Sequence, residues 1–452
     1  MTLPASELAQ DDRRTIRRGG PLALLSSRRF GPLFATQFLS AFNDNALKNA
    51  LVLMVAYRAE GVGQLGAGLL IPLAGGLFIL PFFLCSATAG EIADASDKAR
   101  VIRLIKLAEI AVMVIAAAAT IAGSVGWLLA LLFVMGVQAA FFGPLKYAIL
   151  PDLLAPEELL LGNALVEAGT FLAILLGTIA GMLIAGHHGA VTIGGLIVAV
   201  ALAAWAASLL IPPTRPATER KGLDWNLASA TGRLLRAAAA EPIPFRAMLG
   251  ISWFWLVGAT YLSQFPSYVR FVLGGEETIV TLFLAIFSVG VGAGSLLCNR
   301  ILRGRISARL VPWGALGIGL FSVDLWAATP PSTVAASLAP IGVFLADAAG
   351  WHILLDLFGI AVSGGVFIVP LYALLQTAGE GARRARTIGA NNIVNAAAMV
   401  LSAVATMALV AAGLSVPGLF LLCGIATVAV AVALWRLLPG FTSTPSFAGD
   451  IR

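Results

Sequence analysis

The stretch Pro212–Phe245 reads PPTRPATERKGLDWNLASATGRLLRAAAAEPIPF, and it is the only long polar segment in the interior of the chain. On both sides of it, apolar runs of roughly 20 residues recur, which is the length that crosses a bilayer core. The part from Trp225 to Ala240 has the pattern of an amphipathic helix, which would lie either on the membrane surface or in solvent. We therefore interpret this stretch as the linker between two membrane-embedded halves.

Six apolar spans are expected before the linker and six after it. They lie near residues 32–57, 68–89, 101–121, 126–149, 162–185, 190–211, 246–272, 279–300, 309–326, 353–376, 387–411 and 415–437. The segment 328–352 is fairly apolar, but Pro330, Pro331, Pro340 and Asp347 interrupt it, so we expect an external loop there.

These spans predict an all-α polytopic membrane protein with twelve transmembrane helices in two six-helix bundles. The expected parts are a cytoplasmic N-terminal segment (1–31), the N-terminal bundle (32–211), a cytoplasmic linker (212–245), the C-terminal bundle (246–438) and a cytoplasmic tail (439–452).

The composition excludes a soluble globular protein. Of the 452 residues, 59% are hydrophobic and 12% are charged, whereas a soluble domain carries about 25% charged residues. The net charge of +6 does not indicate a nucleic-acid partner, because the basic residues form short clusters between apolar runs. Cys85, Cys298 and Cys423 lie in apolar spans without the spacing of metal ligands. We expect no metal or cofactor site, and we expect the first helix to act as an uncleaved insertion signal.

The distribution of Lys and Arg predicts the orientation in a bacterial inner membrane, because basic residues accumulate on the cytoplasmic side. With twelve spans, both termini and the linker share one side. That side receives six residues of the linker region and Arg13, Arg14, Arg17, Arg18, Arg28, Arg29, Lys98, Arg100, Arg103, Lys106, Arg300, Arg303, Arg305, Arg309, Arg383, Arg384 and Arg386. The other side receives Arg58 and Arg270, so both termini are predicted to be cytoplasmic.

Ionisable residues inside membrane spans are costly, and each is therefore a functional candidate. The first span contains FNDNALKN at 42–49, in which Asp44 and Lys48 share a helix face and could form an ion pair. Lys146, next to Tyr147, either extends to the cytoplasmic surface or faces Asp44 or Glu167 within the bundle. Gly177 and Gly181 are expected to allow close helix packing.

Neutral polar residues in the spans are further candidates, although packing between helices is an equally good interpretation of each. The complete set of candidate substrate-binding or gating residues is Asp44, Asn45, Lys48, Lys146, Tyr147, Asn163, Glu167, Gln264, Tyr372, Gln376, Asn391 and Asn395.

Sequence motifs of enzymes are missing, so we expect a transporter and not an enzyme. The chain has no phosphate-binding GxxxxGK[ST] loop. A membrane acyltransferase would need a His and an Asp separated by four residues, and His352 and Asp356 do not have this spacing.

The six-plus-six plan resembles the major facilitator superfamily, whose second and third helices are joined by a loop patterned GxxxDRxG[RK]. The corresponding residues here are Gly90, Asp94 and Lys98, followed by Arg100, while Ala95 and Asp97 depart from the pattern. The resemblance implies that this loop, Gly90, Asp94, Lys98 and Arg100, takes part in conformational change.

A closer resemblance is to the lysophospholipid transporters of that superfamily. It rests on QFLSAFNDNAL at 37–47, PLKYAIL at 144–150, NALVEAGT at 163–170, SWFW at 252–255 and VPLYALLQ at 369–376. The similarity extends from about residue 30 to 438. Some relatives have an arginine where this chain has Leu262, and Gln264, Tyr268 or Arg270 could compensate for it.

The resemblance implies transport of lysophosphatidylethanolamine and lysophosphatidylglycerol to the cytoplasmic leaflet, with lateral entry of the lipid and rocking of two bundles. There an acyltransferase or acyl-carrier-protein ligase reacylates them, and such an enzyme is the expected partner besides membrane lipids. We expect this chain to hold the transport unit only. The alternatives are a proton-coupled exporter of amphipathic drugs that uses Asp44 or Glu167, and a scaffold that only recruits acyl-transfer enzymes.

Overall fold

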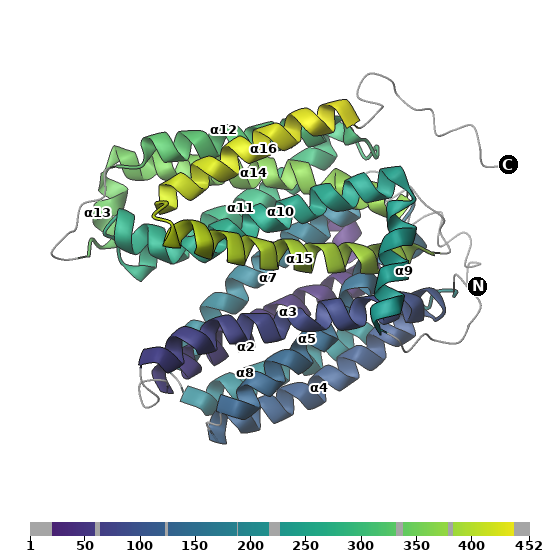
Figure 1. Cartoon of the computed structure of the whole chain (residues 1–452). Coiled ribbons are helices and arrows are strands. Elements are labelled where there is room, and N and C mark those ends of the chain that lie inside the picture. The colour runs from purple at the N-terminus through teal and green to yellow at the C-terminus, as the bar shows by residue number, and fades with distance from the viewer. Residues whose placement is uncertain are drawn as a thin grey trace. The chain divides into compact units, whose positions relative to one another are not determined.

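The computed structural model describes residues 20–58, 64–122, 125–187, 189–216, 227–330, 338–377 and 383–437. All twelve expected spans are long helices (Figure 1). They are α2 (Gly31–Arg58), α3 (Gln64–Asp94), α4 (Lys98–Ala122), α5 (Val125–Ala148), α7 (Leu159–His187), α8 (Gly189–Leu209), α10 (Pro242–Ser267), α11 (Glu277–Leu302), α12 (Val311–Ala328), α14 (Ala348–Thr377), α15 (Arg384–Ala411) and α16 (Val416–Leu437). A π-helical turn, Tyr268–Val272, continues α10.

Among the described residues, 11 helices are long and apolar enough to cross a membrane. The remaining long helix, α2, has 28 residues, and its cluster of polar residues at 43–49 lowers its mean hydropathy. A helix of that length rises about 40 Å, which exceeds the bilayer core. The chain is therefore a multi-pass membrane protein.

The helices cluster into two compact units. Unit 1 comprises residues 1–236 together with 380–393, and unit 2 comprises residues 237–379 and those from 394 onward. The first part of α15 thus belongs to unit 1, whereas the rest of that helix belongs to unit 2.

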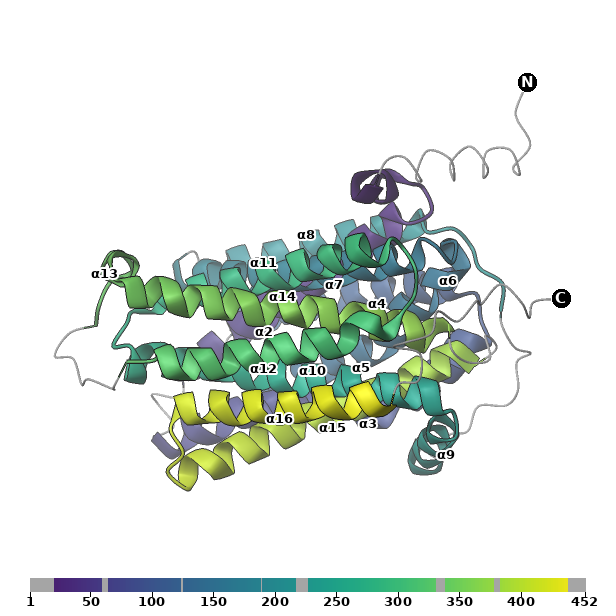
Figure 2. The ribbon, with the colours of Figure 1, turned by 90° about the horizontal axis from the view of Figure 1, so that it is seen from above.

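The two units repeat one packing plan. In unit 1 the second long helix, α3, packs on the fourth, α5, and the third, α4, packs on the sixth, α8. In unit 2 the same positions are taken by α11 on α14 and by α12 on α16. Figure 2 shows that the long helices within each unit run roughly along a common direction. A repeated helical plan is common in transporters built from internal repeats.

Close packing between α2 and α7 depends on two glycines, as the sequence predicts. A Cβ atom added at Gly177 would lie 2.3 Å from the backbone oxygen of Phe42, and one at Gly181 would lie 2.2 Å from that of Ala46. These distances are shorter than any normal contact, so only glycine permits this approach. The polar stretch of α2 thereby lies close enough to α7 for Asn49 to donate a hydrogen bond to Thr178.

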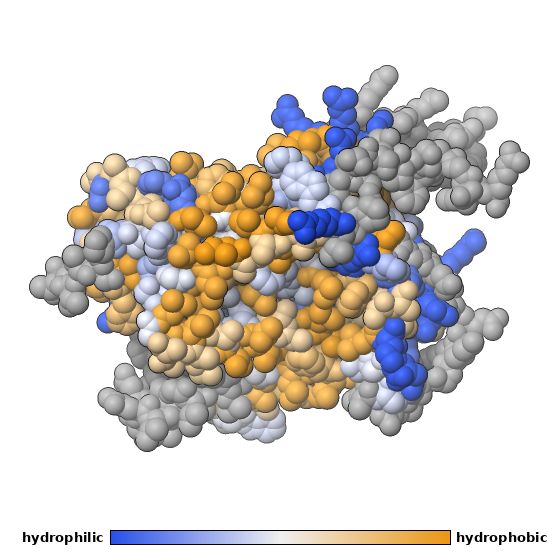
Figure 3. All heavy atoms as spheres, turned by 45° about the horizontal axis from the view of Figure 1, so that its top comes forward, coloured by the Kyte–Doolittle hydropathy of each residue, from blue (hydrophilic) through white to orange (hydrophobic). Residues whose placement is uncertain are grey.

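The helix surfaces are apolar. Exposed side chains include Leu107 and Ile115 on α4, Leu401 and Met407 on α15, and Ile425 on α16. Figure 3 shows hydrophobic residues covering much of the described surface on one face. Such a surface is compatible with lipid and not with water.

Two connecting segments are described in part. The amphipathic helix expected at Trp225 to Ala240 is α9 (Leu227–Ala239). The segment expected to be a loop at 328–352 contains the short helix α13 (Ile341–Ala346), and α14 already begins at Ala348. A four-residue helix, α6 (Leu150–Leu153), follows α5.

Candidate functional site

The polar side chains of α2 are held in place by neighbouring helices and by their own turns. Asn43 donates a hydrogen bond of 3.1 Å to a backbone carbonyl of α8. Asn49 donates bonds of 2.8 Å to the carbonyl of Asn45 and 3.1 Å to Thr178 on α7. Lys48 donates to the side-chain oxygen of Asn45 at 3.1 Å. Buried amides that are bonded in this way fix the rotation of α2 about its axis.

The ion pair that Asp44 and Lys48 could form is not present in the structure, where Lys48 donates to Asn45. The Lys48 ammonium turns to Asn45, which lies three residues back on the same face and offers a closer acceptor. The Oδ1 atom of Asp44 is buried and has no hydrogen-bond partner among the described residues. Asp44 therefore presents an uncompensated acceptor to the interior of unit 1.

A buried ion pair lies close to Asp44, and sequence reasoning missed it. The Lys106 ammonium lies 2.6 Å from Oε2 of Glu109, and both side chains are completely buried. Lys106 also donates to Ser40, and Gln138 donates to the same Glu109 oxygen at 2.5 Å. The expectation that Lys106 lies on the cytoplasmic surface is therefore wrong.

A local signal could have revealed this pair. Lys106 and Glu109 are three residues apart within the apolar run of α4 and thus share a helix face. A carboxylate one turn deeper in the span indicates that the lysine is buried beside it, because a lysine on the surface is solvated and requires no ion-pair partner. Counting Lys106 with the basic residues of the loop concealed this pairing.

Lys146 faces the interior of unit 1 and does not reach out to the surface. Its ammonium lies 4.8 Å from the centroid of the Tyr147 ring, and Glu167 and Asp44 are the carboxylates that act on it electrostatically. Tyr147 donates a hydrogen bond to Oε1 of Glu167, while Oε2 of Glu167 has no hydrogen-bond partner in the described part of the chain. Asn163, a turn before Glu167, donates to a carbonyl of its own helix at 2.9 Å.

These residues form one group of mixed charge inside unit 1, which we call the charge cluster. Asp44 interacts electrostatically with Glu109 and with three lysines, and Lys146 links the group to Glu167. Three positive and three negative side chains make up the charge cluster: Lys48, Lys106, Lys146, Asp44, Glu109 and Glu167.

The conformational loop lies against the start of α15. The buried carboxylate of Asp94 accepts hydrogen bonds from the backbone amides of Ala385 at 2.9 Å and Arg386 at 3.1 Å, and from the Arg386 side chain at 3.2 Å. A carboxylate at the N-terminus of a helix satisfies amides that have no partner within the helix. Gly90 permits the approach, because a Cβ atom there would lie 2.9 Å from Arg386 Cα.

The remaining loop residues differ in their roles. Lys98 is buried and forms an ion pair of 2.8 Å with Asp152, and Arg384 reaches the other oxygen of that carboxylate at 3.3 Å. Arg100, in contrast, is exposed on α4. Asp97, which departs from the family pattern, caps α4 by accepting a bond of 3.0 Å from the amide of Ala99.

Asn391 also lies in the part of α15 that belongs to unit 1. Its side chain is completely buried, and neither the oxygen nor the nitrogen of its amide has a hydrogen-bond partner among the described residues. An unsatisfied buried amide is costly, and this one is a candidate for binding a polar ligand.

The candidates of unit 2 are mostly engaged in contacts between helices. Tyr372 accepts a bond of 3.3 Å from Trp255, and Asn395 accepts one of 2.7 Å from Ser252. Gln376 is buried. These contacts favour a packing role for the polar residues of this unit.

Of the three residues that could compensate for Leu262, none places a cation in the described interior of unit 2. Gln264 is half-buried and contacts Ser263 at 3.5 Å. Tyr268 is buried and shares a hydrogen bond of 2.6 Å with Thr329, and Arg270 is exposed.

Comparison with known proteins identifies the family. Residues 33–354 match the Major Facilitator Superfamily. The lysophospholipid transporter LplT of Escherichia coli O1:K1 is 30% identical over 382 residues, which cover 82% of this chain and 84% of that protein. The chain belongs to the lysophospholipid transporter family of this superfamily. The protein of the same name from Shigella sonnei is 29% identical over 379 residues, with the same coverage.

Solved structures agree with the fold of this family. The human organic anion transporter MFSD10 has a TM-score of 0.68 at 16% identity and covers 91% of this chain and 98% of its own. The fucose:proton symporter FucP of Escherichia coli has a TM-score of 0.64 at 13% identity, covering 90% and 98%. At such identities the likeness shows the fold alone. Membership of this transporter family thus explains the arrangement of the long helices. The role of the charge cluster has to be inferred from the charges and hydrogen-bonding groups of its residues.

Proposed function

We propose that this family member carries lysophosphatidylethanolamine and lysophosphatidylglycerol across the bacterial inner membrane to the cytoplasmic leaflet. The similarity to the lysophospholipid transporter LplT supports the substrate class. The observation that carries the proposal is the uneven pairing within the charge cluster. Lys106 and Glu109 neutralise each other, whereas Asp44 and Lys146 form no ion pair with any described residue.

This pattern suits the headgroup of a lysophospholipid. Phosphate is an anion with several acceptor oxygens, and the ammonium groups of Lys48 and Lys146 can donate to it. The ammonium of lysophosphatidylethanolamine is matched by the free carboxylate oxygen of Asp44. For lysophosphatidylglycerol, the glycerol hydroxyls would donate to Asp44 and Asn45 instead. A headgroup of either kind would therefore complete contacts that the protein leaves open.

The single acyl chain of the substrate requires an apolar environment. Phe42 and Phe141 are half-buried in unit 1, near Asp44 and Lys146 in sequence. In our proposal the lipid enters sideways from the bilayer, and the two bundles rock about it in alternating access. The acyl chain then stays in contact with apolar residues while the headgroup occupies the charge cluster.

The orientation that we propose places both termini and the linker in the cytoplasm. It rests on the bias of Lys and Arg, which remains strong after the buried Lys106 is removed from the count. Reporter fusions at Gly20, Glu219 and Gly379 should all give a cytoplasmic signal. A periplasmic signal at Glu219 would contradict the six-plus-six arrangement.

The partner that we propose is an acyltransferase or acyl-carrier-protein ligase, which would consume the transported lipid. A lysophospholipid acts as a detergent when it accumulates, so delivery and reacylation benefit from being coupled. Copurification of such an enzyme with the tagged chain would support this association. The proposal of transport does not depend on it.

Uptake of labelled lysophospholipid into proteoliposomes tests the function. The purified chain should carry both lipids faster than protein-free liposomes, and a diacyl phospholipid should not be carried. An exporter of amphipathic drugs would instead move its substrate only with a proton gradient and would stop when an ionophore is added. A scaffold would move nothing. Uptake that is absent in liposomes with or without a gradient would refute the proposal.

A further inference from the structure

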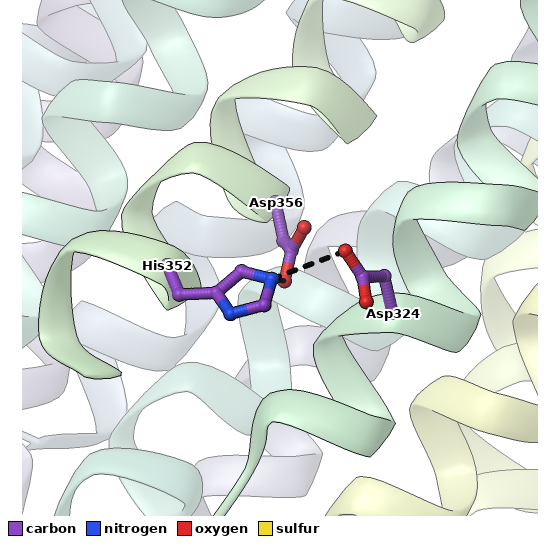
Figure 4. A group of neighbouring side chains, drawn as sticks. All are labelled: Asp324, His352 and Asp356. Atoms are coloured by element: carbon purple, nitrogen blue, oxygen red, sulfur yellow. Dashed lines mark hydrogen bonds and ion pairs between the residues drawn. The ribbon is translucent and has the colours of Figure 1, made fainter. Parts of the chain in front are cut away.

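Three side chains that the charge cluster does not include meet at one end of unit 2. Asp324 lies on the last turns of α12, and His352 and Asp356 lie on the first turns of α14 (Figure 4). The Nε2 atom of His352 is 3.1 Å from Oδ2 of Asp324 and 3.7 Å from Oδ2 of Asp356. All three ligand-type atoms lie within 4.8 Å of one another.

The Asp356 carboxylate is unusual within this group. Its side chain is only 1% exposed, whereas His352 and Asp324 are 47% and 53% exposed. The Oδ2 atom of Asp356 has no hydrogen-bond partner within the ranges that the structure describes, and the carboxylate lies beside the other two side chains (Figure 4). A buried carboxylate oxygen without a hydrogen-bond donor is costly. The His352 Nε2 atom at 3.7 Å is too far for a hydrogen bond, so a cation bound between the three side chains would supply the contact that this oxygen lacks.

The spacing of the three atoms fits a metal ion. In tetrahedral coordination with bonds of about 2.0–2.1 Å, ligand atoms lie about 3.3 Å apart. The two distances from His352 fall on either side of this value. Because Asp324 and His352 are half exposed, small rotations of their side chains can adjust the geometry, and a fourth position stays open to water.

We propose that Asp324, His352 and Asp356 form a binding site for a divalent transition metal of the zinc class. One imidazole nitrogen and two carboxylate oxygens favour zinc, and imidazole is a poor ligand for calcium or magnesium. A bound ion would neutralise the buried carboxylate and would link α12 to α14. The sequence did not predict this site, because Asp324 lies 28 residues before His352 and only the packing of α12 on α14 brings them together.

The proposal of this metal site does not rest on lysophospholipid transport, because its residues belong to unit 2 and its test measures metal binding and not uptake. With the orientation proposed above, it would face the periplasm. There it would be accessible to metal ions outside the cell membrane. The charge cluster, in contrast, belongs to unit 1.

Metal binding to the purified full-length chain tests the site. The chain should be prepared in detergent with a tag that contains no histidine, stripped with a chelator, and dialysed against zinc. We expect about one tightly bound zinc per chain. His352→Gln and Asp324→Asn should each lower the affinity by about tenfold or more, because each removes a ligand of the ion.

The matched control is His187→Gln, which removes a histidine outside the group and should bind zinc as the unaltered chain does. Both test substitutions affect half-exposed side chains, so folding should persist. Cobalt should give the intense visible absorption of tetrahedral coordination, and His352→Gln should abolish it. The proposal fails if the unaltered chain binds no zinc, if His352→Gln binds it equally well, or if excess calcium displaces it.

Discussion

Unit 1 buries the charged side chains of Asp94, Lys98, Lys106, Glu109 and Glu167, whereas the described part of unit 2 buries that of Asp356. The interior of unit 2 is instead built from stacked aromatic rings. Tyr261 lies parallel to Phe420 with ring centroids 4.5 Å apart, and neutral pairs such as Ser252 and Asn395 join its helices.

This difference separates binding from packing. Charge inside a membrane protein is expensive, so a unit that carries three lysines and three carboxylates in one cluster must gain something from them. In unit 2, aromatic rings and hydroxyl groups fill the interior and join the helices without the free-energy cost of burying charge. We therefore expect substitutions of equal size to affect transport much more in unit 1 than in unit 2.

The largest effect is expected for Asp44→Asn. This change keeps the size and hydrogen bonding of the side chain but removes the charge that would match an ammonium group. Uptake of lysophosphatidylethanolamine should fall by about tenfold or more, which corresponds to about 1.4 kcal/mol or more of lost interaction. Initial rates in proteoliposomes measure it.

The control for this change is Asp347→Asn, which makes the same chemical substitution at an exposed position. Both proteins should insert and elute as the unaltered chain does. If well-expressed Asp44→Asn protein transports normally, charge in unit 1 does not serve the headgroup, and the contrast between the units has another cause.

The next effect is on stability and concerns Glu109→Gln. Removal of one partner of a buried ion pair leaves Lys106 uncompensated, which costs about 3–5 kcal/mol. The unfolding temperature in detergent should fall clearly. The double variant Lys106→Met with Glu109→Gln should recover part of the loss, because it removes both charges.

Glu157→Gln is the matched control, since Glu157 is exposed, and it should leave the unfolding temperature unchanged. Equal stability of Glu109→Gln and the unaltered chain would show that Lys106 is stabilised by something other than this carboxylate.

The fold could be read from the sequence because the bilayer imposes a length on each span. Each of the twelve expected spans coincides with a long helix, 11 of these helices qualify as membrane spans among the described residues, and several helices extend past the expected ranges. The span expected at 68–89 is a longer helix, from Gln64 to Asp94. Hydropathy identifies only the apolar part of a helix, whereas backbone hydrogen bonding continues into the polar segments at its ends. The boundaries of the five expected parts, and their sides of the membrane, stay predictions.

The site was less predictable, because it depends on how each helix is rotated about its axis. Asp44, Lys146 and Glu167 were identified as candidates because each is an ionisable residue in an apolar run, and their role in binding stays a prediction. The sequence allowed an ion pair between Lys48 and Asp44, but Lys48 donates to Asn45 instead, because an aspartate and an asparagine on the same helix compete for it. Contacts such as that of Lys106 with Ser40 join residues 66 apart, and no local pattern reveals them.

A smaller effect is expected for Lys146, which belongs to the same cluster but has other lysines nearby. Lys146→Met should reduce uptake several-fold, because one of the cations for the phosphate is lost. The exchange Asp44→Lys with Lys146→Asp should recover part of the transport, as both charges are retained. Lys221→Met in the linker is the control. Normal uptake by Lys146→Met would show that this lysine does not contribute.

The smallest effect is expected in unit 2, for Ser252→Ala. This change removes the hydrogen bond of 2.7 Å to Asn395, and the loss of a neutral bond between buried side chains costs about 1 kcal/mol. Uptake should change by less than about twofold, because in our proposal this pair joins α10 to α15 and does not contact the headgroup. Thermal unfolding and initial rates of uptake, measured on the same preparation, separate the two consequences. A folded Ser252→Ala protein that fails to transport would place a substrate contact in unit 2, and neutral side chains would then take part in recognition alongside the charges of unit 1.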